Sequence, residues 1–306
     1  MTLISSAVGA SAGRSMPHVA GVEHRWVDVH VGQTRQVRLH IAEAGSGPVV
    51  LLLHGFAQHW YAWRDVIPLL AKENRLVCVD TRGFGWSEQT RRGYDTDTLA
   101  ADVLALMDEL GLDRVRLIGQ DWGAGVGFRA CLLAPQRFAG FLAVNAAHPW
   151  PRHRNVLPNL WRMWFTAFIE YPVLGRLTLQ YWPGFIRFFM RYAVADRWRW
   201  PDPVLAEFVA ATQRSAHAGQ ALMWQYVVRE IPALIRGSRK RMRLTVPTVL
   251  LAGAEDPVIP PSVLAGGEKH ADDLTMYVVD GAGHHLPDEA PAAVAEHARR
   301  LFARVA

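Results

Sequence analysis

Three side chains that lie far apart in the sequence could carry out one reaction together: Asp121, Asp256 and His284. Asp121 is the centre of the segment Gly-Gln-Asp-Trp-Gly at residues 119–123, where the glycines allow the backbone a sharp turn. In the Gly-x-Ser-x-Gly form of this turn, the central side chain is a nucleophile raised above the edge of a sheet. Here that side chain is a carboxylate, which is ionised at neutral pH without the help of a base.

A carboxylate nucleophile favours attack on saturated carbon. It forms an ester that water can cleave at the carbonyl, whereas a serine would form an ether that the enzyme could not hydrolyse. The predicted electrophile is therefore an epoxide or a haloalkane. Considered alone, Asp121 fits an ordinary turn or helix cap, His284 a loop histidine and Asp256 a turn residue before proline. Their order along the chain, nucleophile then acid then histidine, is that of a known hydrolase triad and favours the catalytic interpretation.

The chemistry assigns each group a role. His284 would be the general base that activates water, and Asp256 would hold its imidazole in the right tautomer. The backbone N–H groups of Phe56 and Trp122 would form an oxyanion hole for the intermediate. Three further histidines could suggest a metal, but no His-Glu-x-x-His or comparable cluster is present, so we expect them to be surface or structural residues and predict no metal and no cofactor. They are His59, His148 and His285.

Alternating strand and helix patterns would bring these groups to one edge of a sheet. Residues 22–31 and 35–44 alternate apolar and polar side chains and predict an antiparallel pair with one exposed face. Continuous apolar runs at residues 49–53 and 76–79 predict strands that are buried on both faces. Further strands are predicted at residues 115–118, 141–144, 246–253 and 276–279. Helical patterns lie between or after them, at residues 60–71, 99–110 and 290–303. This rhythm predicts an α/β fold with a mostly parallel sheet and helices on both faces.

The pattern changes after Pro149. Residues 150–235 are rich in Trp, Phe and Tyr, with helical spacing and no strand runs, and predict an inserted helical cap. We therefore expect an α/β core at residues 22–149 and 236–306 and a flexible N-terminal tail at residues 1–21. The aromatic side chains of the cap favour a small apolar or aromatic substrate, although their spacing fits core packing equally well.

Composition excludes several classes of protein. The formal net charge is +5, and nearly all the positively charged side chains are arginines. The densest cluster of arginines, in residues 236–243, fits an exposed linker better than an anion site. No nucleic-acid motif accompanies it. Cys78 and Cys131 lie in apolar runs and resemble buried small hydrophobes. No apolar run reaches about 18 residues, so we predict no membrane span and a cytoplasmic location. A homodimer is left open.

The chain resembles the epoxide hydrolase branch of the α/β-hydrolase family over nearly all of residues 22–304. The resemblance is carried by HGFAQHWYAWR, DTRGFGWSE, GQDWGAG, AAHPW, GAEDPVI and GAGHHLPDEAP. It implies an α/β-hydrolase fold with an eight-stranded sheet, a nucleophile at Asp121, an orienting acid at Asp256, a base at His284 and a helical cap from about Trp150. Such enzymes open an epoxide to a vicinal diol through an alkyl-enzyme ester.

Two features depart from the family pattern. Ala57 stands where the family usually has a proline, so a rigid turn is not guaranteed. Phe165 and Met223 align with the two cap tyrosines that protonate the leaving oxygen, and neither can donate a proton. Tyr226 lies three residues beyond Met223, on nearly the same helix face, and could replace them. Tyr171, Tyr181 and Tyr192 are weaker candidates.

Two alternatives remain open. A haloalkane dehalogenase needs no proton for its leaving halide, and Trp122 could offer its indole N–H to the halide; Phe56 stands where that family often has an Asn or acidic residue. A hydrolase-fold protein that binds an apolar ligand without turnover would also tolerate the altered cap.

Overall fold

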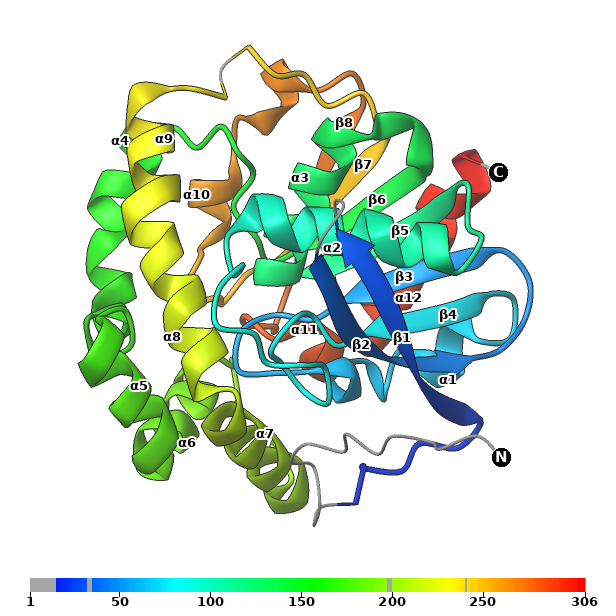
Figure 1. The fold of residues 1–306 in the computed structure, drawn as a ribbon. Helices are drawn as coiled ribbons and strands as arrows, with labels where there is room; N and C mark the ends of the chain where they lie inside the picture. Colours follow the sequence, from blue (N-terminus) through cyan, green and yellow to red (C-terminus); the bar gives the residue numbers. More distant parts are fainter. Residues whose placement is uncertain (1–14, 32–34, 197–199, 240, 306) are drawn as a thin grey trace.

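The structure is a computed structural model that describes residues 15–31, 35–196, 200–239 and 241–305. The described residues form one sheet of eight strands in the order β1-β2-β4-β3-β5-β6-β7-β8 (Figure 1). The strands are β1 (Val22–Val31), β2 (Arg35–Ala44), β3 (Val49–Leu53), β4 (Arg75–Val79), β5 (Val115–Gln120), β6 (Phe138–Val144), β7 (Thr248–Gly253) and β8 (Leu274–Val279). β1 pairs with β2 and β2 with β4 in antiparallel fashion, and all the other pairs are parallel. The predicted mostly parallel sheet is confirmed.

Helices cover both faces of the sheet, which explains the continuous apolar runs of its central strands. Along β3, Leu51 and Leu53 belong to one core cluster, and Val50 and Leu52 belong to the other, so successive side chains point to opposite faces. Helices α2 and α3 pack on the first face, and α1 and α12 on the second (Figure 1). The bounds of these helices are α1 (Ile67–Leu70), α2 (Thr96–Glu109), α3 (Trp122–Leu133) and α12 (Pro291–Arg304). Shorter helical turns are η1 (Trp60–Trp63), η2 (Pro135–Arg137), α10 (Pro261–Leu264), η5 (Gly267–His270) and α11 (Leu286–Glu289).

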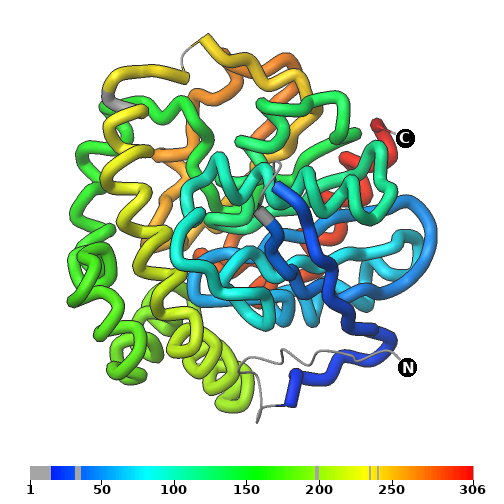
Figure 2. The backbone as a smooth tube through the Cα atoms, viewed as in Figure 1, coloured from blue at the N-terminus to red at the C-terminus, as the bar shows by residue number. Residues whose placement is uncertain are grey.

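A run of helices separates β6 from β7, and we call it the helical insertion. Its elements are α4 (His153–Val156), η3 (Leu157–Phe168), α5 (Pro172–Tyr181), α6 (Pro183–Tyr192), α7 (Asp202–Arg214), α8 (Ala216–Gln225), the π-helical turn η4 (Tyr226–Glu230) and α9 (Ile231–Arg236). Figure 2 shows the chain leaving the sheet, running down one side of the molecule in green and returning upward in yellow before it rejoins the sheet at β7.

Local signals move some helix boundaries away from the predicted ones. The helix expected over residues 60–71 is two short pieces, η1 and α1, because the turn at Trp60 is capped by the His59 side chain and a new helix begins around Pro68. The helix expected from Leu99 begins earlier, since the Asp95 side chain accepts a hydrogen bond from the Thr98 N–H and caps it.

The chemical state of the cysteines agrees with the sequence. Cys78 and Cys131 are free and buried, as predicted. No helix in the described ranges is long and apolar enough to span a bilayer. Residues 1–14 of the predicted tail lie outside the described residues.

Candidate active site

The turn between β5 and α3 carries Asp121 in a backbone conformation that few side chains adopt. Asp121 has φ 50° and ψ −118°, a strained combination for a non-glycine residue. The two flanking glycines are required by close packing. A Cβ on Gly123 would lie 2.2 Å from the Leu53 carbonyl oxygen, and one on Gly119 would lie 2.7 Å from the Ala124 Cα. The turn therefore holds the Asp121 carboxylate at the carboxyl edge of the sheet.

The structure brings Asp121, Asp256 and His284 together at this edge. His284 Nδ1 lies 2.8 Å from Asp256 Oδ2, and His284 Nε2 lies 3.6 Å from Asp121 Oδ1. The side chains of His284 and Asp256 are 4% and 0% exposed, whereas that of Asp121 is 16% exposed. The imidazole thus lies between two carboxylates, of which Asp121 is the one with exposed surface.

The Phe56 backbone N–H donates to Asp121 Oδ2 over 2.9 Å. One carboxylate oxygen of Asp121 therefore lies at the predicted oxyanion position, and the other faces His284. Burial alone would raise the pKa of Asp121, but the charge of His284 and the N–H groups of Phe56 and Trp122 outweigh it and hold the pKa below its ordinary value. The carboxylate is charged at neutral pH, as a nucleophile must be.

His284 carries a proton in the same state. Burial would lower the pKa of His284, but the negative charges of Asp256 and Asp121 outweigh it and raise that pKa to about 10. At neutral pH the three side chains thus hold one imidazolium between carboxylates, and a change in the charge on Asp121 changes the basicity of His284.

Asn145, which the sequence analysis missed, holds this arrangement in place. It follows β6 with φ 45° and is fully buried. Its Nδ2 donates to Asp256 Oδ2 and to the Gly283 carbonyl oxygen, both over 2.8 Å, and its Oδ1 accepts from the Gly253 N–H over 3.2 Å. The available signal was a polar residue directly after a buried strand, at the same edge as the other three.

A second missed residue, Glu289, fixes the loop that carries His284. Its carboxylate accepts hydrogen bonds from the backbone N–H groups of Gly283, His285 and Ala195, over 2.8, 2.9 and 2.8 Å. Since Ala195 belongs to the helical insertion, Glu289 ties the His284 loop to it. The His284 N–H adds a bond to the Ala193 carbonyl oxygen over 2.8 Å.

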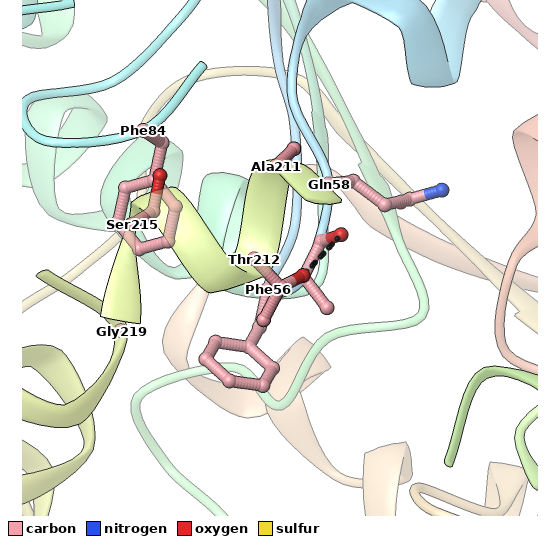
Figure 3. Close-up of a pocket in the computed structure, with 8 residues that line it drawn as sticks. Phe56, Gln58, Phe84, Ala211, Thr212, Ser215 and Gly219 are labelled. Carbon is pink, nitrogen blue, oxygen red and sulfur yellow. Dashed lines mark hydrogen bonds between the residues drawn. The ribbon is translucent and has the colours of Figure 1, made fainter. Parts of the chain in front are cut away.

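The loop after β3 takes a shape that a proline could not adopt. Ala57 has φ 64°, whereas a proline ring fixes φ near −65°. With Ala57 in place of the usual proline, the loop therefore adopts a turn that a proline could not form. Thr212 on α7 donates to the Ala57 carbonyl oxygen over 3.3 Å, as the dashed line in Figure 3 shows. His59 Nε2 lies 3.1 Å from Glu207 Oε1 on the same helix, so the loop is fastened to the helical insertion twice.

A small cavity of 10 Å³ lies beside this loop, between Phe56 and the helices α7 and α8 (Figure 3). It has room for about one water molecule. Gln58 and Ser215 contribute polar side chains to its lining.

The candidate residues of the predicted cap lie in different surroundings. Phe165 and Met223 are buried apolar side chains; Phe165 packs against Phe189 with ring centroids 4.5 Å apart. Tyr226 begins the π-helical turn η4, and its ring meets that of Trp122 edge-on at 5.3 Å. Burial raises the pKa of Tyr226, and the charges of Glu230, Glu170 and Asp121 add to the rise. Tyr226 therefore keeps its proton within electrostatic reach of Asp121.

The three additional histidines are not surface residues. His59, His148 and His285 are each at most 1% exposed, so of the two predicted roles only the structural one applies. Burial lowers the pKa of His285 to about 3, and the charge of His284 adds to this effect. Within the described part of the chain, no group of three His, Cys, Asp or Glu side chains could hold a metal ion.

A mostly parallel eight-stranded sheet with an acidic residue on a tight strand-to-helix turn defines a hydrolase of the α/β type. Residues 48–291 match the family described as the α/β hydrolase fold, and the chain belongs to that family. It is 27% identical over 295 residues to the "Soluble epoxide hydrolase" of Corynebacterium sp. (strain C12), covering 90% of this chain and 96% of the relative.

Two further relatives show how far the likeness extends. "Haloalkane dehalogenase 2" of Mycobacterium tuberculosis (strain ATCC 25618 / H37Rv) is 28% identical over 286 residues, covering 91% of this chain and 94% of the relative. The solved structure "Epoxide hydrolase CorEH without ligand" has a TM-score of 0.80 and 25% identity, covering 93% of this chain and all of the other. The predicted resemblance to epoxide hydrolases is confirmed, and dehalogenases are similar to the chain to the same degree.

Proposed function

We propose that this protein opens epoxides to vicinal diols through an ester formed on Asp121. The observation that carries the proposal is the state of that carboxylate: one oxygen accepts from the Phe56 N–H, and the other faces His284, which is bonded to Asp256. In this proposal residues 150–235 are a cap over a core of residues 22–149 and 236–306, with a tail at residues 1–21, and the enzyme acts in the cytoplasm without a cofactor.

In the first step, an oxygen of Asp121 attacks an epoxide carbon and the ring C–O bond breaks. The electron pair moves onto the ring oxygen, which takes a proton from Tyr226. Asp121 loses its negative charge when the ester forms, so the pKa of His284 falls. The His284 imidazolium then gives up its proton, and the Tyr226 oxygen is protonated again. Ester, alcohol and neutral His284 are the net products, and no external proton is consumed.

In the second step, neutral His284 takes a proton from water, and the oxygen of that water attacks the ester carbonyl of Asp121. The N–H groups of Phe56 and Trp122 stabilise the negative oxygen of the tetrahedral intermediate. The bond between the acyl carbon and the alkyl oxygen then breaks. The alkyl oxygen takes the proton of the hydroxyl group that the water left on the acyl carbon, and the diol leaves. Asp121 is again a carboxylate and His284 an imidazolium, which is the state of the free enzyme.

The substrate follows from the side chains above Asp121. The ring of Phe56, whose backbone N–H donates to Asp121, meets that of Phe189 edge-on at 6.3 Å, and Phe189 lies tilted against Phe165 at 4.5 Å between centroids. They favour a small apolar or aromatic epoxide.

Haloalkane hydrolysis is the second candidate, because Phe165 and Met223 cannot protonate a leaving group and a halide needs no proton. The proton balance distinguishes the two reactions. With a halide as leaving group, the proton of His284 must go to solvent before water can be activated. With an epoxide, that proton replaces the one that Tyr226 gave to the ring oxygen, so none has to go to solvent.

The test is to incubate the wild type with styrene oxide and with 1-bromohexane and to measure diol and bromide. We expect diol, and we expect Asp121→Ala to reduce its formation to the buffer rate. Asp113→Ala is the matched control, since Asp113 is exposed near the opposite end of β5. Bromide without diol would overturn the epoxide assignment in favour of dehalogenation, and neither product would favour a ligand-binding protein without turnover.

A further inference from the structure

The outer side of the helical insertion exposes an unusual amount of apolar surface. Twelve of the eighteen large hydrophobic side chains exposed in the described chain lie between residues 157 and 188, in about a tenth of its length. Trp161 is 65% exposed and Val173 73% exposed. We call the surface formed by η3, α5 and α6 the outer face; α5 and α6 lie on the side of the molecule away from the sheet (Figure 1). Exposed apolar patches of this kind mark contact surfaces.

The exposed rings are contiguous across two elements. Trp164 lies 6.1 Å from Phe168 and 5.9 Å from Phe188, and Phe168 lies 6.4 Å from Trp182, measured between ring centroids. All four side chains are between 38% and 52% exposed. These four side chains of the outer face therefore form one continuous aromatic surface and are not isolated.

The charge of the same segment is one-sided. Residues 153–192 contain five arginines and a single acidic residue, Glu170. Arg154 and Arg176 are exposed. Arg162 lies over the Trp161 ring, with its guanidinium carbon 5.0 Å from the centroid. Aromatic side chains interleaved with cations are typical of helices that lie in the interface of a lipid bilayer, where Trp and Tyr reside at the level of the headgroups.

We propose that the outer face binds the surface of a bilayer containing anionic lipids. The exposed arginines, Arg154 and Arg176, complement a negative headgroup layer, and the exposed rings can enter the boundary with the acyl chains. A second copy of the chain is the poorer occupant, because a two-fold contact would place this arginine-rich face against itself. The contact is peripheral, since no described helix is long enough to cross the bilayer.

The position of the outer face suggests a use for it, and this part alone rests on the proposed function. Trp164 lies 6.3 Å from Phe165, which packs on Phe189 at 4.5 Å, and Phe189 lies 6.3 Å from Phe56. Rings thus lead from the outer face to the loop that donates to Asp121. These rings are packed side chains and not an open channel, and the use proposed here is that a bilayer on this face brings apolar substrates to this side of the molecule.

The test is co-sedimentation of the full chain with sucrose-loaded vesicles of phosphatidylcholine alone or mixed with phosphatidylglycerol, without substrate. We expect binding to the mixed vesicles at least tenfold tighter than to phosphatidylcholine, and weaker in high salt. Leu174→Glu and Arg176→Glu should each weaken binding about tenfold.

The controls are Leu133→Glu on α3 and Arg300→Glu on α12, which are exposed to similar degrees on the core and should leave vesicle binding unchanged. Failure to sediment with anionic vesicles would overturn the proposal, as would equal losses in the core controls. A dimer in ultracentrifugation that Leu174→Glu dissociates would assign the face to a second copy instead. Because vesicle binding needs no turnover, its failure is separate from a failure of the epoxide assay.

Discussion

The carboxyl edge of the sheet and the helical insertion above it are built from different kinds of side chain. At the sheet edge, Asp121, Asp256 and His284 are held by hydrogen bonds, and Asn145 adds three more. In the insertion, the two positions that align with the proton-donating tyrosines of the family carry buried apolar side chains, Phe165 and Met223.

The difference separates two parts of the proposed reaction. Formation and hydrolysis of an ester on Asp121 need groups that belong to the core, whereas protonation of the leaving oxygen needs a donor from the insertion. Among the candidate donors from the insertion, Tyr226 contacts Trp122, which directly follows Asp121. Changes in the insertion should therefore act on one class of substrate, and changes at the sheet edge on every class.

Tyr226→Phe tests whether the insertion supplies the proton donor, and it should have the largest effect. We expect epoxide opening to slow about 100-fold, because the ring oxygen loses its proton donor. Bromide release from a haloalkane should be unchanged, since that leaving group needs no proton. Tyr181→Phe, at a side chain that is 69% exposed, is the control. Equal rates for Tyr226→Phe and the wild type on epoxides would remove Tyr226 from the mechanism.

The ion pairing of His284 at the sheet edge can be tested through the pH dependence of stability. The folded-state pKa of His284, about 10, lies above its ordinary value of 6.5, so the pair with the carboxylates stabilises the fold fully below pH 6.5. That stabilisation is lost as the pH rises through about 10. We expect urea unfolding to show a decrease on the order of a few kcal/mol between pH 6.5 and 10 that is absent from His284→Gln. Parallel pH profiles for the two proteins would contradict the ion pair.

Asn145→Ala should have an intermediate effect. It leaves a buried carboxylate oxygen and a buried carbonyl oxygen short of a donor, which costs about 1–3 kcal/mol of unfolding free energy. Hydrolysis of the ester should slow with every substrate, since Asp256 is less firmly placed. Asn159→Ala, in the insertion, is the matched control, and comparable losses in both variants would show that Asn145 has no special place at the sheet edge.

The smallest effect is expected at Ala57. Its positive φ costs a non-glycine residue roughly 1 kcal/mol, and Ala57→Gly relieves that strain while making the unfolded chain more flexible, so the unfolding free energy should change by less than about 1 kcal/mol. Ala62→Gly, in the ordinary helical turn η1, should only destabilise. If Ala57→Gly destabilises as much as Ala62→Gly, the turn is not strained.

Much of the core could be predicted because it depends on local patterns. A continuous apolar run such as residues 49–53 marks a strand buried on both faces, and in a parallel sheet the residues after such runs meet at one edge. That rule alone places Asp121, Asp256 and His284 together. The same rule applies to Asn145, which directly follows β6.

Contacts between the insertion and the core were harder to predict because they depend on packing in three dimensions. Nothing in the sequence places Tyr226 on Trp122, since that contact depends on a π-helical turn that follows α8. Glu289 resembles a surface acid in the sequence, and its role appears only when three backbone N–H groups converge on it. The burial of His285 depends likewise on the ring of Trp200, with centroids 5.4 Å apart.

The central claim, that Asp121 forms an ester at saturated carbon, is tested most directly by intact-mass analysis of His284→Gln after incubation with styrene oxide. Without the base, the ester forms and is not cleaved, so we predict a persistent mass increase equal to one substrate molecule, located by peptide mapping on Asp121. An adduct on another residue, or none while the wild type turns the epoxide over, would contradict the account.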